Sequence, residues 1–246
     1  MTLDDRSPLQ GKAVLITGAA SGLGAALAQR LAASGADILG VDLQEARLRE
    51  HMASLRRHGV QAQALAADIA DPACAWQSVR QALDLFGRLD ILVNNAGTDV
   101  TLPISEMLEA DWMRVVGTNL SAPFLLSKYA ADAMRREKSG HIVNIASTAA
   151  KRAWPNASAY HASKWGLLGL SHALHAELRA DNIRVTAVVA GGMRTPFLLE
   201  RFPELDASAL QDPMDVAEAI HSVLLLPPTT VVAELTVLPL RETSWP

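Results

Sequence analysis

The chain has 246 residues, of which 50% are apolar and 20% are charged, and its formal net charge is −4. This composition excludes disordered and fibrous proteins, and the charges form no basic stripe of the kind that binds a nucleic acid. Because α/β folds of this length often form one unit, we expect a single domain over residues 1–246.

The start of the chain and its apolar stretches bear on location. Met1 to Gln10 is polar and acidic, without the basic start and apolar run of a secretory signal. No segment offers the roughly 18 uninterrupted apolar residues of a membrane helix. The single cysteine, Cys74, cannot form an intrachain disulfide. We therefore expect a cytoplasmic protein with no membrane partner.

Short apolar runs alternate with helical stretches along the first third of the chain. Short apolar runs are typical of strands, and glycine or proline marks the boundaries of the helices. Strands are predicted at Ala13 to Thr17, Asp37 to Val41 and Ala62 to Ala67, and helices at Leu23 to Ala33, Glu45 to His58 and Pro72 to Phe86.

The alternation continues through the middle of the chain and then loosens. Further strands are predicted at Ile91 to Asn94, Ile142 to Ala146 and Arg184 to Val189, and helical stretches at about Trp112 to Arg136 and Ser158 to Ala180. Residues 191–212, with two prolines and several charges, are interpreted as a substrate lid. A helix at about Met214 to Leu225 and a last apolar run, Leu235 to Leu238, complete the chain.

This order of elements predicts the fold class. Short apolar strands without polar alternation are typical of parallel strands that are buried on both faces. With right-handed crossovers they form an α/β fold, a Rossmann-type doubly wound, seven-stranded and mostly parallel sheet with helices on both faces. In such a sheet the ligand crevice lies at the carboxyl ends of the strands.

The turn after the first strand has the pattern of a phosphate-binding turn. Thr17 to Gly24 reads TGAASGLG, and it follows a strand and opens a helix. Glycine is needed where backbone approaches a pyrophosphate closely, at a helix N-terminus whose amides hold the anion. A glycine cluster alone is weak evidence, because many such clusters are plain turns.

Asp42 closes the second strand, where an acid can accept hydrogen bonds from an adenosine ribose and repel a 2′-phosphate. Alternatively, Asp42 caps the helix that follows. No Arg or Lys stands in the glycine turn, so NAD is favoured over NADP.

Tyr160 and Lys164 are four residues apart on a predicted helix, so they share one face. A phenol that works near neutral pH needs its pKa lowered by about 3 units, or ~4 kcal/mol. A positive charge at about 4 Å supplies ~4 kcal/mol at an effective dielectric constant near 20. Ser147, just past an apolar strand, could bind a carbonyl oxygen in the same crevice. An exposed Tyr and Lys pair on a helix is the alternative reading.

Several motifs occur together in a characteristic order. They are TGAASGLG at Thr17 to Gly24, DI at Asp68 and Ile69, NNAG at Asn94 to Gly97, Asn119, Ser147, and YHASK at Tyr160 to Lys164. With these motifs the chain resembles the short-chain dehydrogenase/reductase family over about Leu9 to Leu240. The resemblance implies an NAD(P)-dependent oxidoreductase that interconverts a secondary alcohol and a ketone.

The resemblance also implies a role for each matching position. Tyr160 would be the general acid and base, Lys164 would lower its pKa and hold the nicotinamide ribose, and Ser147 would orient the substrate oxygen. Asn119 would hold a water that links Lys164 to solvent, and Asp68 and Ile69 would bound the adenine. The expected cofactor-binding residues are Gly18, Ser21, Gly22, Leu23, Gly24, Asp42, Asp68, Ile69, Asn95, Ala96, Gly97, Tyr160, Lys164, Met193 and Thr195.

Two stretches depart from the family pattern. Ala190, Gly191 and Gly192 stand where the family usually has Pro-Gly, although Thr195 still suits a nicotinamide contact, and the family's common glycine pair near the carboxyl end is missing. Both departures blur the substrate pocket and the assembly. Four apolar side chains could wall that pocket, with a structural role as the equal alternative for each: Trp154, Trp165, Met193 and Phe197. A sugar-derived polyol, a cyclic diol and a 3-oxoacyl group all stay open as substrates.

Partners and competing functions complete the sequence-based picture. Small residues on the Ser158 to Ala180 helix, with the long helix before it, suggest a homo-oligomer, either a dimer or a homotetramer. The histidines lack the spacing of a zinc site, so no metal is predicted. A nucleotide-sensing regulator on the same fold, or an epimerase or dehydratase that retains NAD, are the alternative functions.

Overall fold

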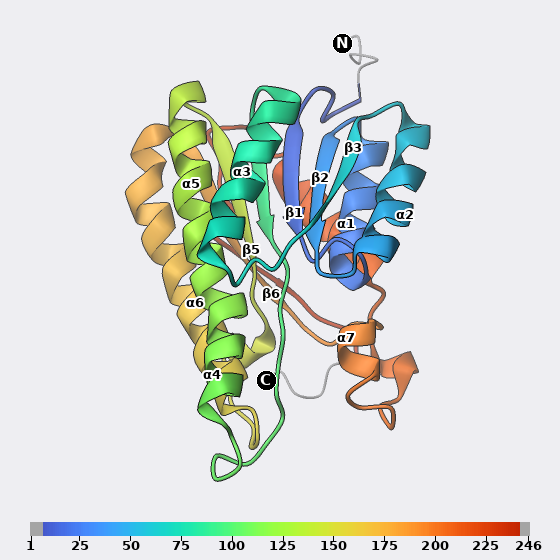
Figure 1. Ribbon diagram of the computed structural model, residues 1–246, viewed down its shortest axis with the longest axis vertical. Coiled ribbons are helices and arrows are strands. Elements are labelled where there is room, and N and C mark those ends of the chain that lie inside the picture. Colours follow the sequence, from blue (N-terminus) through green and yellow to red (C-terminus); the bar gives the residue numbers. More distant parts are fainter. Residues whose placement is uncertain (1–6, 242–246) are drawn as a thin grey trace.

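The computed structural model describes residues 7–241, and one parallel sheet of seven strands runs through this part of the chain (Figure 1). The strand order is β3-β2-β1-β4-β5-β6-β7, and every neighbouring pair is parallel. The strands are β1 (Ala13–Thr17), β2 (Asp37–Asp42), β3 (Ala62–Ala66), β4 (Ile91–Asn94), β5 (Gly140–Ile145), β6 (Ile183–Ala190) and β7 (Glu234–Val237). The predicted doubly wound α/β fold is confirmed.

Helices cover both faces of this sheet because its central strands are apolar on both sides. On β1, Val14 and Ile16 face one hydrophobic cluster and Leu15 faces the other. The first cluster includes α1 (Gly22–Ala33), α2 (Glu45–Leu55) and α8 (Pro213–Leu224). The second includes α3 (Pro72–Phe86), α5 (Ala122–Glu137) and α6 (Ser158–Leu178).

The strand order reverses between β1 and β4, and this switch point locates the ligand crevice at the carboxyl edge of the sheet. Two segments extend past that edge in Figure 1. One is the loop before α4 (Glu109–Val116), and the other carries α7 (Pro196–Leu199). Residues 191–212, expected as a lid, contain α7 and a short 3₁₀ turn, Ala207–Ala209.

The helical stretch predicted at Trp112 to Arg136 is confirmed, with one local irregularity. It begins at Glu109, and a π-helical turn, Gly117–Ser121, separates α4 from α5. Pro123 has no backbone N–H, so the carbonyl of Asn119 lacks its usual helical donor four residues on. The sequence contains this proline, but propensity alone does not distinguish a widened turn from a break.

Candidate active site

The glycine turn between β1 and α1 has the backbone that only glycine adopts easily. Gly18 and Gly22 have φ angles of +68° and +54°. A Cβ at Gly24 would overlap the carbonyl oxygen of Gly18, so no larger residue fits there. Among the described residues, no side chain caps the start of α1 and no acid stands in its first turn. The amides of this turn therefore suit an anion such as a pyrophosphate.

Residues at the end of β4 hold the glycine turn in place. The Thr17 hydroxyl oxygen accepts hydrogen bonds from the backbone N–H groups of Asn95 and Ala96, both at 3.1 Å. Asn95 Nδ2 donates to the carbonyl oxygens of Thr17 at 2.9 Å and Gly18 at 3.1 Å. The predicted residues Asn95 and Ala96 thus join the two strands that flank the switch point.

Asp42 lies beside the glycine turn as well as ahead of α2. Its Oδ2 accepts a hydrogen bond from the Ala20 backbone N–H at 3.0 Å, and its Oδ1 accepts one from the Gln44 N–H at 2.9 Å. The carboxylate therefore bridges the glycine turn and the approach to α2. Asp42 does not cap α2, because the N-cap residue is Gln44 and no side chain caps this helix among the described residues.

A cation missed by the sequence reasoning lies near this carboxylate. A hollow of about 350 Å³ is lined by the glycine turn at Ala20, Ser21 and Gly22 and by α2 residues that include Arg47. Arg47 lies outside the glycine turn, and the prediction of NAD rested on the absence of cations within that turn. Arg47 is five residues past Asp42, on the first turn of α2, and that spacing could have identified it.

The other expected cofactor residues lie along the same edge, at different depths. Thr195 is buried, and its methyl carbon is 3.2 Å from where a Cβ on Gly22 would stand. Met193 forms a single β-bridge with Gln211. At the end of β3, Ile69 is buried in the core and Asp68 is exposed, accepting a hydrogen bond from the Ala70 N–H. The glycine-rich turn, its uncapped amides and Asp42 together fit a dinucleotide.

Tyr160, Lys164 and Ser147 meet at the carboxyl end of β5. Tyr160 and Lys164 lie one turn apart on α6, and the Lys164 ammonium is 5.7 Å from the centre of the Tyr160 ring. Lys164 Nζ donates a 2.8 Å hydrogen bond to the carbonyl oxygen of Ile145. Ser147 follows β5, and its hydroxyl is hydrogen-bonded to Tyr160. The alternative of an exposed Tyr and Lys pair is wrong, because Lys164 is only 4% exposed.

Burial dominates the electrostatics of this trio. It raises the pKa of Tyr160 to about 12, although the hydrogen bond from Ser147 opposes the shift. Burial also lowers the pKa of Lys164 to about 8. The role of Lys164 in lowering the pKa of the phenol, together with an oxidised nicotinamide, stays a prediction. In the structure the Lys164 ammonium donates its hydrogen bond to the Ile145 carbonyl.

Asn119 is fully buried at the π turn and holds the loop that follows the NNAG motif. Its Nδ2 donates to the Thr98 carbonyl at 2.8 Å and to Ser163 Oγ at 3.0 Å, and its Oδ1 accepts from the Thr98 N–H at 2.8 Å. A Cβ on Gly97 would be 3.4 Å from Asn119 Oδ1 and 3.7 Å from Lys164 Nζ. Asn119 and Lys164 thus face the same stretch of chain.

Two charged residues near Tyr160 were not identified from the sequence. Asp99 follows the NNAG motif, and Arg201 follows α7 on the opposite segment. Arg201 Nη1 is 3.7 Å from Asp99 Oδ2, and its guanidinium lies 4.0 Å over the ring of Phe197. The Phe197 and Tyr160 ring centres are 6.1 Å apart. The carboxyl-edge rule applied to Ser147 could have pointed to Asp99, but not to its partner.

The described residues, 7–241, also bear on metal binding and on membrane insertion. No group of three or more His, Cys, Asp or Glu side chains in that range is arranged to hold a metal ion. In the same range, no helix is long and apolar enough to cross a membrane.

Comparisons with known proteins agree with this geometry. A family model described as short chain dehydrogenase matches residues 12–206. D-threitol dehydrogenase of Mycolicibacterium smegmatis is 38% identical, with 76% of this chain and 72% of that protein covered. 3beta-hydroxysteroid dehydrogenase 1 of Eggerthella lenta is 35% identical, with 82% and 78% covered.

Solved structures are similar over almost the whole chain. A metagenomic short-chain oxidoreductase in complex with NADP is 32% identical and superimposes with a TM-score of 0.84, covering 95% of this chain and 99% of that one. NAD⁺-bound xylitol dehydrogenase is 28% identical with a TM-score of 0.85, covering 93% and 98%. Relatives of this kind bind either nicotinamide dinucleotide.

Proposed function

The chain belongs to the short-chain dehydrogenase family, whose members are oxidoreductases that act on CH–OH groups. We therefore propose that it interconverts a secondary alcohol and a ketone, with NAD as its preferred cofactor. The observation that carries the proposal is the meeting of Ser147, Tyr160 and Lys164 at the carboxyl end of β5, one strand away from the glycine turn's anchor on β4.

Ser147 and Tyr160 bind and protonate the substrate oxygen. Their hydroxyl groups are hydrogen-bonded to each other, so one substrate oxygen can contact both. Tyr160 donates a proton to that oxygen when a ketone is reduced and removes it when an alcohol is oxidised. Ser147 caps a 3₁₀ turn, with its Oγ 3.1 Å from the Ala149 N–H, which fixes the direction of its hydroxyl.

Lys164 and Asn119 assist proton transfer at the Tyr160 phenol. The pKa of Lys164 lies at about 8, so its ammonium can exchange a proton close to neutral pH. The Asn119 carbonyl, without its usual helical donor, is available to a water that would connect Lys164 with solvent. The strongly raised pKa of Tyr160 means that the phenolate needs further stabilisation from positive charge during the reaction.

NAD would bind along the carboxyl edge, with its pyrophosphate at Gly18, Ser21, Gly22, Leu23 and Gly24. Asp42 would accept hydrogen bonds from the adenosine ribose, Asp68 and Ile69 would bound the adenine, and Thr195 and Met193 would approach the nicotinamide end. When bound, the nicotinamide supplies the hydride acceptor or donor and, in its oxidised form, a positive charge. This assignment rests on the position of Asp42 beside Ala20, only a 3.0 Å hydrogen bond away.

The surrounding chain would complete the enzyme. We propose that residues 1–246 work as a single domain, with residues 191–212 as the lid, since Thr195 already lies against Gly22. We also propose a homo-oligomer, because α6 exposes Trp165 and the small residues Ala162 and Gly169.

Replacing Tyr160 by Phe tests the proposed function. The variant keeps the ring but loses the exchangeable proton, so we expect turnover of secondary alcohols to fall by about 10²- to 10⁴-fold while NAD affinity is retained. Nicotinamide absorbance with a panel of secondary alcohols and ketones measures the first effect, and calorimetric titration the second. Tyr129→Phe, at the only other tyrosine, is the matched control.

Two results would contradict the proposal. Full turnover in Tyr160→Phe would exclude the proton-transfer role. A wild-type protein that binds nucleotide but turns over no substrate would favour a sensor, and one purified with tightly bound nucleotide would favour an epimerase or dehydratase.

A further inference from the structure

Asp99 presents a carboxylate oxygen whose environment is incomplete. The side chain is 9% exposed, and its buried Oδ1 has no hydrogen-bond partner among the described residues. The other oxygen, Oδ2, accepts a 3.3 Å hydrogen bond from the Thr101 hydroxyl and lies 3.7 Å from Arg201 Nη1. A buried carboxylate oxygen without a donor is costly, so Oδ1 is a candidate to accept a hydrogen bond from a bound molecule.

Two independent sets of contacts join Asp99 to the catalytic residues. Along the backbone, Asp99 follows Thr98, which Asn119 holds through both its N–H and its carbonyl, and Gly97, which faces Lys164 Nζ. Through side chains, the Arg201 guanidinium lies between the carboxylate and the Phe197 ring, which is beside Tyr160.

The charges of Asp99 and Arg201 change the pKa values of the catalytic residues, which is consistent with this placement. The Asp99 carboxylate raises the pKa of both Tyr160 and Lys164, and Arg201 lowers the pKa of Tyr160. Both charges therefore act on the place where the substrate oxygen would be bound.

The chemistry of the pair restricts what can bind there. A carboxylate only accepts hydrogen bonds, so the ligand group must be a donor. A substrate ammonium would be repelled by Arg201, and a substrate carboxylate or phosphate would be repelled by Asp99. A 3-oxoacyl group offers only carbonyl acceptors near its reacting carbon and would leave Oδ1 unpaired. A neutral hydroxyl satisfies both charges.

We propose that Asp99 is a specificity-determining residue that accepts a hydrogen bond from a second hydroxyl of the substrate. The enzyme then acts on neutral diols and polyols and on their hydroxyketones, in preference to monohydroxy alcohols and 3-oxoacyl compounds. This inference rests on the proposed function, because it assumes that the reacting oxygen binds at Ser147 and Tyr160.

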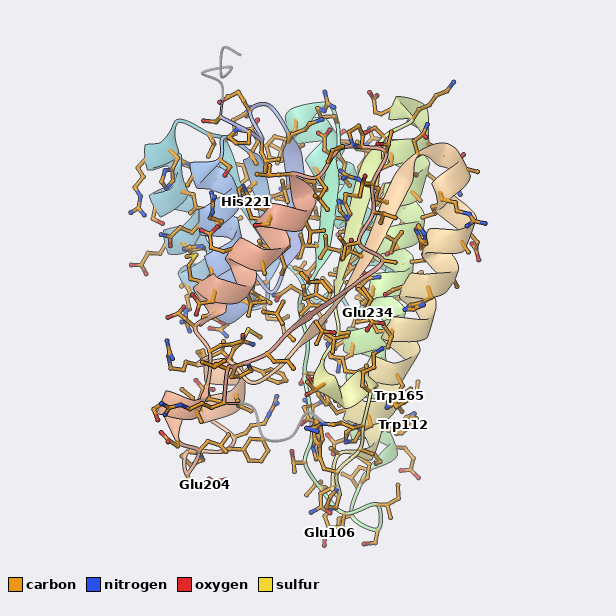
Figure 2. The ribbon with its side chains drawn as sticks, turned by 180° about the vertical axis from the view of Figure 1, so that it is seen from behind. Glu106, Trp112, Trp165, Glu204, His221 and Glu234 are labelled. Atoms are coloured by element: carbon orange, nitrogen blue, oxygen red, sulfur yellow. The ribbon has the colours of Figure 1, made fainter. Side chains whose placement is uncertain are left out.

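The test compares matched substrates in matched variants. The substrates are cyclohexanol, cyclohexane-1,2-diol and cyclohexane-1,3-diol. The variants are Asp99→Asn and Asp99→Ser. For the wild type we expect the better diol to exceed cyclohexanol in kcat/KM by at least about tenfold, and Asp99→Asn to lower that ratio by about 10- to 100-fold. Glu204→Gln is the control. Glu204 is exposed at the tip of the proposed lid, residues 191–212, in Figure 2 and does not face the site, so removing its charge should leave the ratio unchanged.

The diols and cyclohexanol react at the same Tyr160. The ratio of their kcat/KM values therefore cancels any effect of the variant on Tyr160 and reports on the second hydroxyl. A loss of activity that is equal for the diols and cyclohexanol would overturn the proposal while the proposed function stands. So would a wild type that oxidises cyclohexanol as well as either diol. Thermal unfolding of each variant confirms that it is folded, and Asp99→Ser repeats the comparison with a smaller side chain.

Binding separates this inference from the reaction itself. In Tyr160→Phe loaded with NAD, calorimetric titration should give the better diol at least about tenfold tighter binding than cyclohexanol, and Asp99→Asn in that background should remove the difference. Equal affinities in the presence of Asp99 would overturn the inference even if turnover had failed for other reasons.

Discussion

Two charged side chains lie at the proposed cofactor site. Asp42 stands beside the glycine turn, where its carboxylate accepts the Ala20 N–H, and Arg47 lines the hollow next to Ser21. The two charges have opposite preferences for a ribose phosphate: Asp42 repels it and Arg47 attracts it. Under the proposed function, Asp42 prevails because it lies at the turn itself, and Arg47 is exposed on α2.

Removing the Asp42 charge should allow Arg47 to attract the 2′-phosphate of NADP. We expect Asp42→Asn to raise affinity for NADP relative to NAD by at least about tenfold, and Arg47→Ala in that background to cancel most of the gain. Calorimetric titration of both dinucleotides measures the ratio, with Glu45→Gln on the same helix as the control. An unchanged ratio in Asp42→Asn would mean that this carboxylate does not discriminate.

At the scale of elements, β5 combines a structural and a functional task. All of its residues are buried, and Ser147 follows its carboxyl end. Toward its amino end, His141 is 1% exposed, and its Nε2 shares a 2.8 Å hydrogen bond with Thr186 Oγ1 on β6. Burial, with a smaller contribution from the Arg184 charge, lowers the pKa of His141 to about 3.

This shift makes the stability of the sheet depend on pH. The unfolded chain binds a proton at His141 near its ordinary pKa of 6.5, whereas the folded chain does so only near 3. Stability from His141 is therefore complete above pH 6.5 and is lost as the pH falls toward 3, by at most ~1.4 kcal/mol per unit.

Urea unfolding of His141→Gln tests this. We expect the variant to lose about 1–2 kcal/mol less free energy of unfolding than the wild type between about pH 7 and 5. The exposed His58→Gln is the control. Parallel pH dependence in His141→Gln and wild type would show that the neutral histidine makes no such contribution.

At the scale of the whole molecule, one side carries a surface that the monomer leaves uncovered. α4 packs on α6, and Figure 2 shows Trp112 and Trp165 close together on these helices. Their exposed fractions are 38% and 52%, and Met113 beside Trp112 is 67% exposed. Exposed aromatic residues beside the small residues Ala162 and Gly169 suit a close helix contact with a second copy.

Charge introduced into this surface should dissociate the proposed oligomer. We expect Trp165→Glu to convert a dimer or tetramer into a smaller species at micromolar concentration, as light scattering with size-exclusion chromatography would show. Trp76→Glu on α3, at a tryptophan of nearly equal exposure, 51%, should leave the mass unchanged. A monomeric wild type, or an unchanged mass for Trp165→Glu, would contradict self-association through this face.

Features that depend on near neighbours in the chain could be predicted from the sequence. The apolar run of β1, the glycine turn and the start of α1 all lie within Ala13 to Gly24, and their order indicates both the fold and the dinucleotide site. The spacing of Tyr160 and Lys164 likewise follows from one helical turn. Helix propensity did not predict the π turn beside Pro123, because a proline inside a helical stretch can widen a turn or end the helix.

The tertiary structure alone decided what depends on distant segments and on burial. Asp99 and Arg201 are about a hundred residues apart in the chain, and they meet only because the loop after β4 and the segment after α7 extend past the same edge of the sheet. The pKa of Tyr160 is raised because packing removes water from its hydroxyl, a quantity that no residue spacing encodes. The chain's local patterns thus determined the fold and the spacing of Tyr160 and Lys164, whereas desolvation and long-range contacts determined the pKa of Tyr160 and the pairing of Asp99 with Arg201.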